Sequence, residues 1–250
     1  VVPTISGPVF LETVQSLTES LAERGYQLML GQAGYAGTRE DPLLEAIIGR
    51  RPDGIVLTGI MHSVEGRRRL LASGIPVVET WDLTPTPIDM LVGFSHVDVG
   101  RKVVEFLHAK GRRRLAVVSG DDERAKRRHD AFQAAARELG LEEVPVIVVP
   151  APTTLRSGRA ALADLIQRSS PVDAIFCSSD LLALGVMTEA QDKGYVVIAL
   201  EARRAALDVD ARTLKPAALR ARAKALDADA RAVVQDVLQR RLQVPGRTGL

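Results

Sequence analysis

Apolar residues along most of the chain recur in short blocks that predict alternating strands and helices. Brief runs rich in Val, Ile and Leu suit buried strands. The predicted strands are 1–3, 27–31, 55–57, 76–78, 90–94, 115–119, 144–149, 174–177 and 196–200. Between them apolar residues recur every three or four positions, which is the spacing of one helix face. The predicted helices are 10–24, 42–48, 64–72, 99–109, 124–139, 157–166 and 181–193.

This alternation predicts an α/β fold with parallel sheets covered by helices on both faces. The pattern restarts after residue 110, so we expect two doubly wound lobes, 1–110 and 111–200, with a cleft between them. In such sheets ligands bind beyond the carboxyl ends of the strands. Residues that directly follow strands are therefore the candidates for a binding site.

Composition changes after residue 200. Residues 201–250 form an atypical Ala/Arg-rich tail with eleven Lys and Arg, six Asp and Glu and no aromatic residue. The whole chain of 250 residues carries a net charge of only +2, so no chain-wide basic field indicates nucleic-acid binding. No apolar run reaches the roughly 18 residues that a membrane span needs.

The residue types that carry most enzyme chemistry are sparse. The one cysteine, Cys177, excludes an intrachain disulfide and a multi-Cys zinc site, and it ends an apolar strand where we expect it to pack as a small hydrophobe. The sequence contains no phosphate-binding glycine loop and no G-x-S-x-G nucleophile turn. We therefore expect a protein that is not an enzyme and needs neither cofactor nor metal.

Seven motifs stand in order along residues 1–198. They are TISGPVF (4–10), DGIVLT (53–58), GIPVVE (74–79), GFSHVD (93–98), GRRRLAVV (111–118), the helix 128–139 and FCSSDLLALG (176–185). Together they resemble the effector-binding core of the LacI/GalR family of bacterial transcription regulators. The His-Ser pair after the strand at 55–57, the letters VGF and the letters DER most resemble the gluconate-repressor branch. After residue 198 the chain departs from the family, because EARR (201–204) stands where members carry a Gly-Phe/Tyr-x-Asp motif.

The resemblance implies a function. It suggests the periplasmic-binding-protein-like sensor of a cytoplasmic, homodimeric transcriptional regulator of the LacI family. A sugar or sugar acid, with gluconate-like compounds favoured, would shift the lobe arrangement and so the affinity for operator DNA. DNA would be bound only through an N-terminal headpiece, which this sequence lacks. The alternatives are a periplasmic sugar-binding protein of a transport system and an α/β enzyme; the turn GRRRL (111–115) resembles regulators more.

Two arginines are the main candidates for ligand contact. The resemblance makes Arg128 the cleft arginine that grips sugar hydroxyls or a carboxylate, a role that suits its rigid, always charged fork of five donors. The alternative is a solvated helix face, since Arg128 ends a basic run. Arg124 lies one helical turn earlier on the same side. Two arginines would suit an acidic ligand such as an aldonate.

Three polar residues precede or begin predicted helices. Asp98 fits both a helix N-cap and the family's acid that accepts hydrogen bonds from sugar hydroxyls. Ser179 and Asp180 match the family's Asn-Asp pair. The serine is shorter than asparagine, so its contact could run through water. We expect Asp180 to cap the helix that begins at residue 181.

The first lobe supplies further candidates. Thr58 follows a strand and could face the cleft, whereas His62 is expected in a surface loop. Phe10 and Tyr35 could stack on a sugar face; for Phe10 the alternative is burial on its own helix. Trp81 is expected to be a packing anchor.

Overall fold

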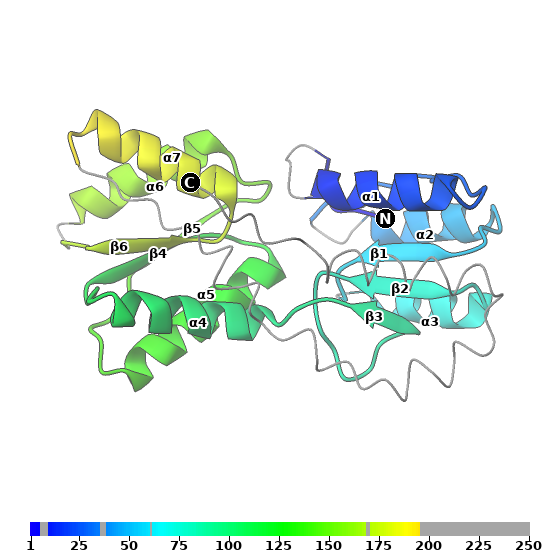
Figure 1. Cartoon of the computed structure of the whole chain (residues 1–250), viewed down its shortest axis with the longest axis horizontal. Helices are drawn as coiled ribbons and strands as arrows, with labels where there is room; N and C mark the ends of the chain where they lie inside the picture. The colour runs from blue at the N-terminus through cyan, green and yellow to red at the C-terminus, as the bar shows by residue number, and fades with distance from the viewer. Residues whose placement is uncertain (6–9, 36–38, 61, 169–170, 196–250) are drawn as a thin grey trace. The chain divides into compact units, whose positions relative to one another are not determined.

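The computed structural model describes residues 1–5, 10–35, 39–60, 62–168 and 171–195. These residues form two compact units, one over Val1–Gly93 and one that begins at Phe94 (Figure 1). The boundary lies between Gly93 and Phe94, earlier than the expected boundary at residue 110, because the helix over His96–Ala109 packs with the second unit. The predicted strand 196–200 and the tail 201–250 lie outside the described residues.

The first unit is built on a parallel sheet. Its strands follow one another in the order β1-β2-β3: β1 (Ile55–Thr58), β2 (Val77–Thr80) and β3 (Met90–Val92). On the free edge of β1, the backbone N–H of Thr58 donates to the carbonyl of Val1, and Val2 forms an isolated bridge to Gln32. The strand predicted over 27–31 is not formed, since pairing is limited to that bridge.

Helices flank this sheet. They are α1 (Leu11–Ala22), α2 (Glu40–Ile48) and α3 (Val64–Ser73). The core of the unit joins residues of α2 and α3 to β1, β2 and the segment before β3: Leu44, Ile47, Ile55, Leu57, Leu70, Val77 and Ile88. Helix α3 ends at Gly74, whose φ of 68° is the left-handed conformation that glycine adopts without strain.

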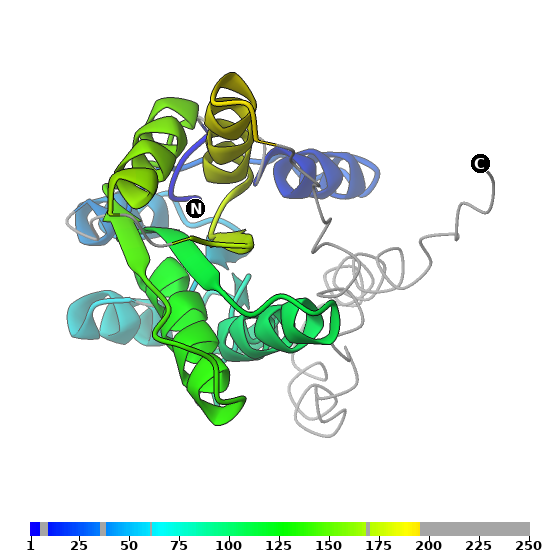
Figure 2. The ribbon, with the colours of Figure 1, turned by 90° about the vertical axis from the view of Figure 1, so that its left-hand side faces the viewer.

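The second unit is a three-layer sandwich. Its parallel strands lie in the order β5-β4-β6: β4 (Leu115–Gly120), β5 (Val146–Val149) and β6 (Ala174–Cys177). Four helices cover them: α4 (His96–Ala109), α5 (Glu123–Glu138), α6 (Leu155–Gln167) and α7 (Asp180–Asp192). Figures 1 and 2 show α4 and α5 on one face of the sheet and α6 and α7 on the other.

Alternation along β4 explains the two layers of helices. Successive side chains of a strand point to opposite faces. Leu115 and Val117 pack in one core with residues of α4 and α5, whereas Ala116 and Val118 pack in another with residues of α6 and α7. Both faces of the strand are apolar, as a buried parallel strand requires. The predicted α/β class with parallel sheets is confirmed.

Candidate ligand-binding site

Arg128 lies at the carboxyl edge of the second sheet, where three elements meet. It projects from α5, and its Nη1 lies 2.9 Å from Nδ1 of His96, the first residue of α4. Its Nη2 donates a hydrogen bond of 3.1 Å to the backbone carbonyl of Ser178, directly after β6. The half-buried guanidinium is thus bound in place by two neighbouring elements, and the solvated-face alternative does not describe it.

The turn after β6 is tied to the neighbouring strand and loop. The backbone N–H of Gly120, at the end of β4, donates to Oγ of Ser178 at 2.9 Å. Oγ of Ser179 lies 2.8 Å from Oγ1 of Thr153. The first bond joins the end of β4 to the residue directly after β6, whose carbonyl holds Arg128, and the second joins this turn to the segment before α6.

Two predicted helix caps are wrong by one and three positions. Ser179, not Asp180, caps α7 by accepting from the N–H of Leu182, and Asp180 is the exposed first residue of that helix. Ser95, not Asp98, caps α4 by accepting from the N–H of Asp98 at 3.0 Å. Ser and Asp cap helices about equally well, so the sequence does not separate neighbouring candidates. Exposed Asp98 stands in the first turn, where its charge favours the positive helix end.

Arg124 occupies the first turn of α5 and is half-buried. Asp122 is the N-cap of the helix, and its carboxylate accepts from the N–H of Ala125 at 3.1 Å. The spacing of four residues places Arg124 on the same side of α5 as Arg128. Both arginines therefore stand on the half of the helix that begins at the carboxyl edge of the sheet.

His62 in the first unit is buried, so the prediction of a surface loop was wrong. Its side chain is only 4% exposed. Nδ1 lies 2.6 Å from Oε1 of Glu40, and Nε2 lies 3.3 Å from Oε1 of Glu79, an ion-pair contact that is not a hydrogen bond. Glu79 is fully buried on β2, and its other oxygen accepts from the N–H of Ile88 at 2.6 Å. A carboxylate within the apolar strand GIPVVE is the signal that could have predicted a buried cation.

The two carboxylates set the protonation of His62. Burial alone would lower the pKa of this imidazole, but the contacts with Glu40 and Glu79 outweigh it and raise the pKa to about 9. His62 is therefore a cation in the folded protein near neutral pH.

A stability profile should reveal this charge. The folded-state pKa of His62 lies above its ordinary 6.5, so its contribution to stability is complete below pH 6.5 and is lost as the pH rises through 9. We expect the free energy of unfolding to fall between pH 7 and 10, measured by urea denaturation. An H62Q variant should lose this part of the slope; the same slope in H62Q would assign it to other groups.

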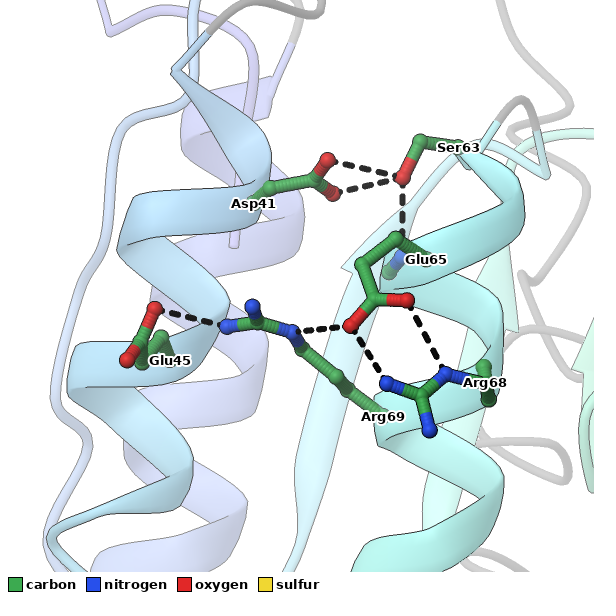
Figure 3. Close-up of polar contacts among 7 residues, drawn as sticks. Asp41, Glu45, Ser63, Glu65, Arg68 and Arg69 are labelled. Carbon is green, nitrogen blue, oxygen red and sulfur yellow. Dashed lines mark hydrogen bonds and ion pairs between the residues drawn. The ribbon is translucent and has the colours of Figure 1, made fainter.

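Helix α2, which begins at Glu40, and helix α3, which follows His62 in the sequence, are connected by ion pairs and by a hydrogen bond from a serine hydroxyl (Figure 3). Arg69 of α3 joins Glu45 of α2 to Glu65, which also pairs with Arg68. These arginines lower the pKa of the Glu65 carboxyl to about 2. Next to them, Asp41 of α2 accepts from Oγ of Ser63 at 2.7 Å, while that oxygen accepts from the N–H of Gly66 and caps α3.

The aromatic candidates lie in the first unit. Phe10 is 4% exposed and packs edge-on against Trp81, with ring centroids 5.2 Å apart. Phe10 is therefore buried, which is the alternative to its stacking on a sugar face. Trp81 adopts a left-handed φ of 68°, a conformation that costs a non-glycine residue about 1–2 kcal/mol. Thr58 ends β1 and Tyr35 follows the bridge at Gln32; both are half-buried. Ligand contact by these residues stays a prediction.

Other chemistry finds little support among the described residues. Burial raises the pKa of the Cys177 thiol to about 12, so it is a packing group, as expected. Within the described ranges, no three His, Cys, Asp or Glu side chains gather as metal ligands would. None of the described helices is both long and apolar enough to cross a membrane.

Together, the two α/β units and the polar residues at their strand ends define a ligand-binding protein of periplasmic-binding-protein type. Residues 1–240 match the family described as periplasmic binding proteins and sugar binding domain of LacI family. The chain belongs to this family, and the effector-binding core expected from the motifs is confirmed.

Its relatives include transcription regulators. The chain is 31% identical over 198 residues to the HTH-type transcriptional regulator GntR of Pseudomonas aeruginosa and 30% identical over 197 residues to GntR of Escherichia coli. Each alignment covers 78% of this chain, and the chain spans 58% and 59% of those relatives. Among solved structures, the transcription regulator GntR from Chromobacterium violaceum matches with a TM-score of 0.73 and 31% identity, covering 78% of this chain and 73% of that one. These relatives agree with the branch that the motifs indicated.

Proposed function

We propose that this chain is the ligand-sensing core of a LacI-type transcription regulator that binds a sugar acid of the gluconate type. The observation that carries the proposal is Arg128, bound in place at the carboxyl edge of a parallel sheet. A guanidinium fork pairs with a carboxylate through two parallel hydrogen bonds, which a neutral sugar does not offer. Arg124 one turn away adds a second cation. The regulators among its relatives favour this role over sugar transport.

The proposed mechanism involves no bond making or breaking. An effector that binds two arrangements of the units with different affinity shifts their populations by that difference alone. In the longer regulator, which is expected to be a homodimer, this shift would change the affinity of a separate DNA-binding headpiece for its operator.

A thermal-shift panel tests the ligand class. The panel holds gluconate, related sugar acids, and neutral hexoses and pentoses. A ligand at 100 times its Kd adds about 2.7 kcal/mol to the stability, which for a chain of this size raises Tm on the order of 5–10 °C. We expect the acids alone to shift Tm. A shift with neutral sugars alone would overturn the acid specificity, and no shift with any compound would overturn the sensor.

Replacing Arg128 tests the site. In R128A the affinity for gluconate should fall about 30-fold or more, because the variant removes one partner of a charged hydrogen-bonded pair. R137A is the matched control, since Arg137 stands exposed in the last turn of the same helix. Isothermal titration gives both affinities and circular dichroism checks the fold. An R128A affinity equal to that of R137A would remove Arg128 from the site.

A further inference from the structure

The contact between Arg128 and His96 defines the protonation of the histidine. Nη1 of Arg128 lies 2.9 Å from Nδ1 of His96. A guanidinium carries five N–H donors and no acceptor, and it stays charged at every physiological pH. Nδ1 must therefore accept this hydrogen bond with its lone pair. His96 is then a neutral imidazole with its single proton on Nε2.

The surroundings of His96 favour the neutral form. The residue is 3% exposed and stands at the first position of α4, whose positive helix end disfavours a second positive charge. The ring of Phe94 packs edge-on with centroids 4.9 Å apart. Among the described residues, the charged groups at this carboxyl edge include Arg124 on α5 and the exposed carboxylates of Asp98 and Asp180 in the first turns of α4 and α7. They also include Asp121, Asp122 and Glu123, which stand between β4 and the first turn of α5. His129 contacts Ser119 and Asp130 instead.

The arginine is fixed at two points from different elements. Nδ1 of His96, at the start of α4, accepts from Nη1 of Arg128. The carbonyl of Ser178, directly after β6, accepts from Nη2. Two anchored N–H directions define the plane of the guanidinium. The long side chain is thus ordered before a ligand arrives, which lowers the entropic cost of binding.

We propose that His96 is a positioning residue for the anion site. Its neutral imidazole, protonated on Nε2, orients the guanidinium of Arg128. The inference rests on the proposed function for its consequence in ligand affinity. The geometric part concerns the protein without ligand and is tested separately.

The first test is nuclear magnetic resonance of the full chain, labelled with ¹⁵N-histidine. The chain contains four histidines, so loss of a signal in H96N assigns His96. We expect the Nε2–H tautomer at pH 7. In R128A this tautomer preference should weaken and the titration midpoint of His96 should move to higher pH, whereas R137A should match the wild type. An Nδ1–H tautomer or an imidazolium at pH 7 in the wild type would overturn the proposal.

The second test compares two replacements of His96 by their affinity for gluconate. Asn places an acceptor oxygen near the position of Nδ1, whereas Leu fills similar space without an acceptor. We expect H96L to bind about tenfold more weakly or worse, the loss typical of a hydrogen bond to a charged group, and H96N to stay within about threefold of the wild type. Equal losses in both variants would show a merely structural role and overturn the proposal.

The two tests separate the two hypotheses. If no sugar acid binds but His96 shows the Arg128-dependent Nε2–H tautomer, the proposed function fails and the positioning of the cation stands. If gluconate binds while His96 carries its proton on Nδ1, the positioning role fails and the proposed function stands. If H96L does not fold, the tautomer measurement on the wild type and R128A still decides.

Discussion

Replacing His62 with Leu is expected to lower the free energy of unfolding by about 3–5 kcal/mol, the usual cost of removing one partner of a buried ion pair. The variant takes away the cation that lies between Glu40 and Glu79. Glu79 has no exposed surface, so solvent does not replace the lost contact. Its carboxyl group must then be buried as an uncompensated charge or hold a proton, and either state costs free energy.

A second substitution distinguishes this cause from simple loss of packing. In the H62L background, E79Q should recover part of the lost stability, because a neutral amide is cheaper to bury than an unpaired carboxylate. H108L is the matched control, since His108 is half-buried in the last turn of α4 and should cost less than about 1 kcal/mol. Urea denaturation gives all four values. A double variant no more stable than H62L would contradict the ion-pair account.

Replacing Gly100 with Ala should cost about 3 kcal/mol, at the upper end of overpacking effects. A Cβ at this position would lie 2.2 Å from the backbone carbonyl of Arg128 and 3.0 Å from the N–H nitrogen of Phe132. Both atoms belong to the backbone of α5, so the helices must separate. By helix propensity alone the same change would stabilise α4 by about 1 kcal/mol, and a net loss therefore measures the close approach.

The displaced segment of α5 is the one that carries Arg128, so G100A should also weaken gluconate binding. G54A is the control, because a Cβ on Gly54 would meet only the carbonyl of Pro76 at an ordinary 3.7 Å. Denaturation and titration on both variants check the two effects. Stability of G100A equal to or above that of the wild type would show that α4 and α5 do not pack as closely as described.

The sequence predicted those elements whose apolar pattern is complete within a few residues. The continuous run of β4 and the three-or-four spacing of α4 and α5 each identify an element without knowledge of its neighbours. The segment 27–31 shows the limit, because its apolar run resembles a strand but a strand also needs a partner along its length. Helix starts were uncertain for a similar reason, since Ser95 and Asp98 both suit a cap.

The site shows the same division. Arg128 was predicted from the family motif, but its partners His96 and Ser178 were not, because they lie 32 and 50 positions away and have no local pattern in common with it. His62 was misplaced because a loop histidine shows its burial only through the carboxylates that surround it. His96, Ser178 and His62 are recognised only by their contacts with other helices and strands. The spacing of residues along one helix or strand does not predict such contacts.

The contact between Trp81 and Phe10 gives the protein an intrinsic optical reporter. Trp81 is the only tryptophan in the chain, so all indole fluorescence comes from the segment after β2 in the first unit. The proposed anion site around Arg128 belongs to the second unit. A change in emission on adding a sugar acid would therefore register an event in one unit through a fluorophore that belongs to the other.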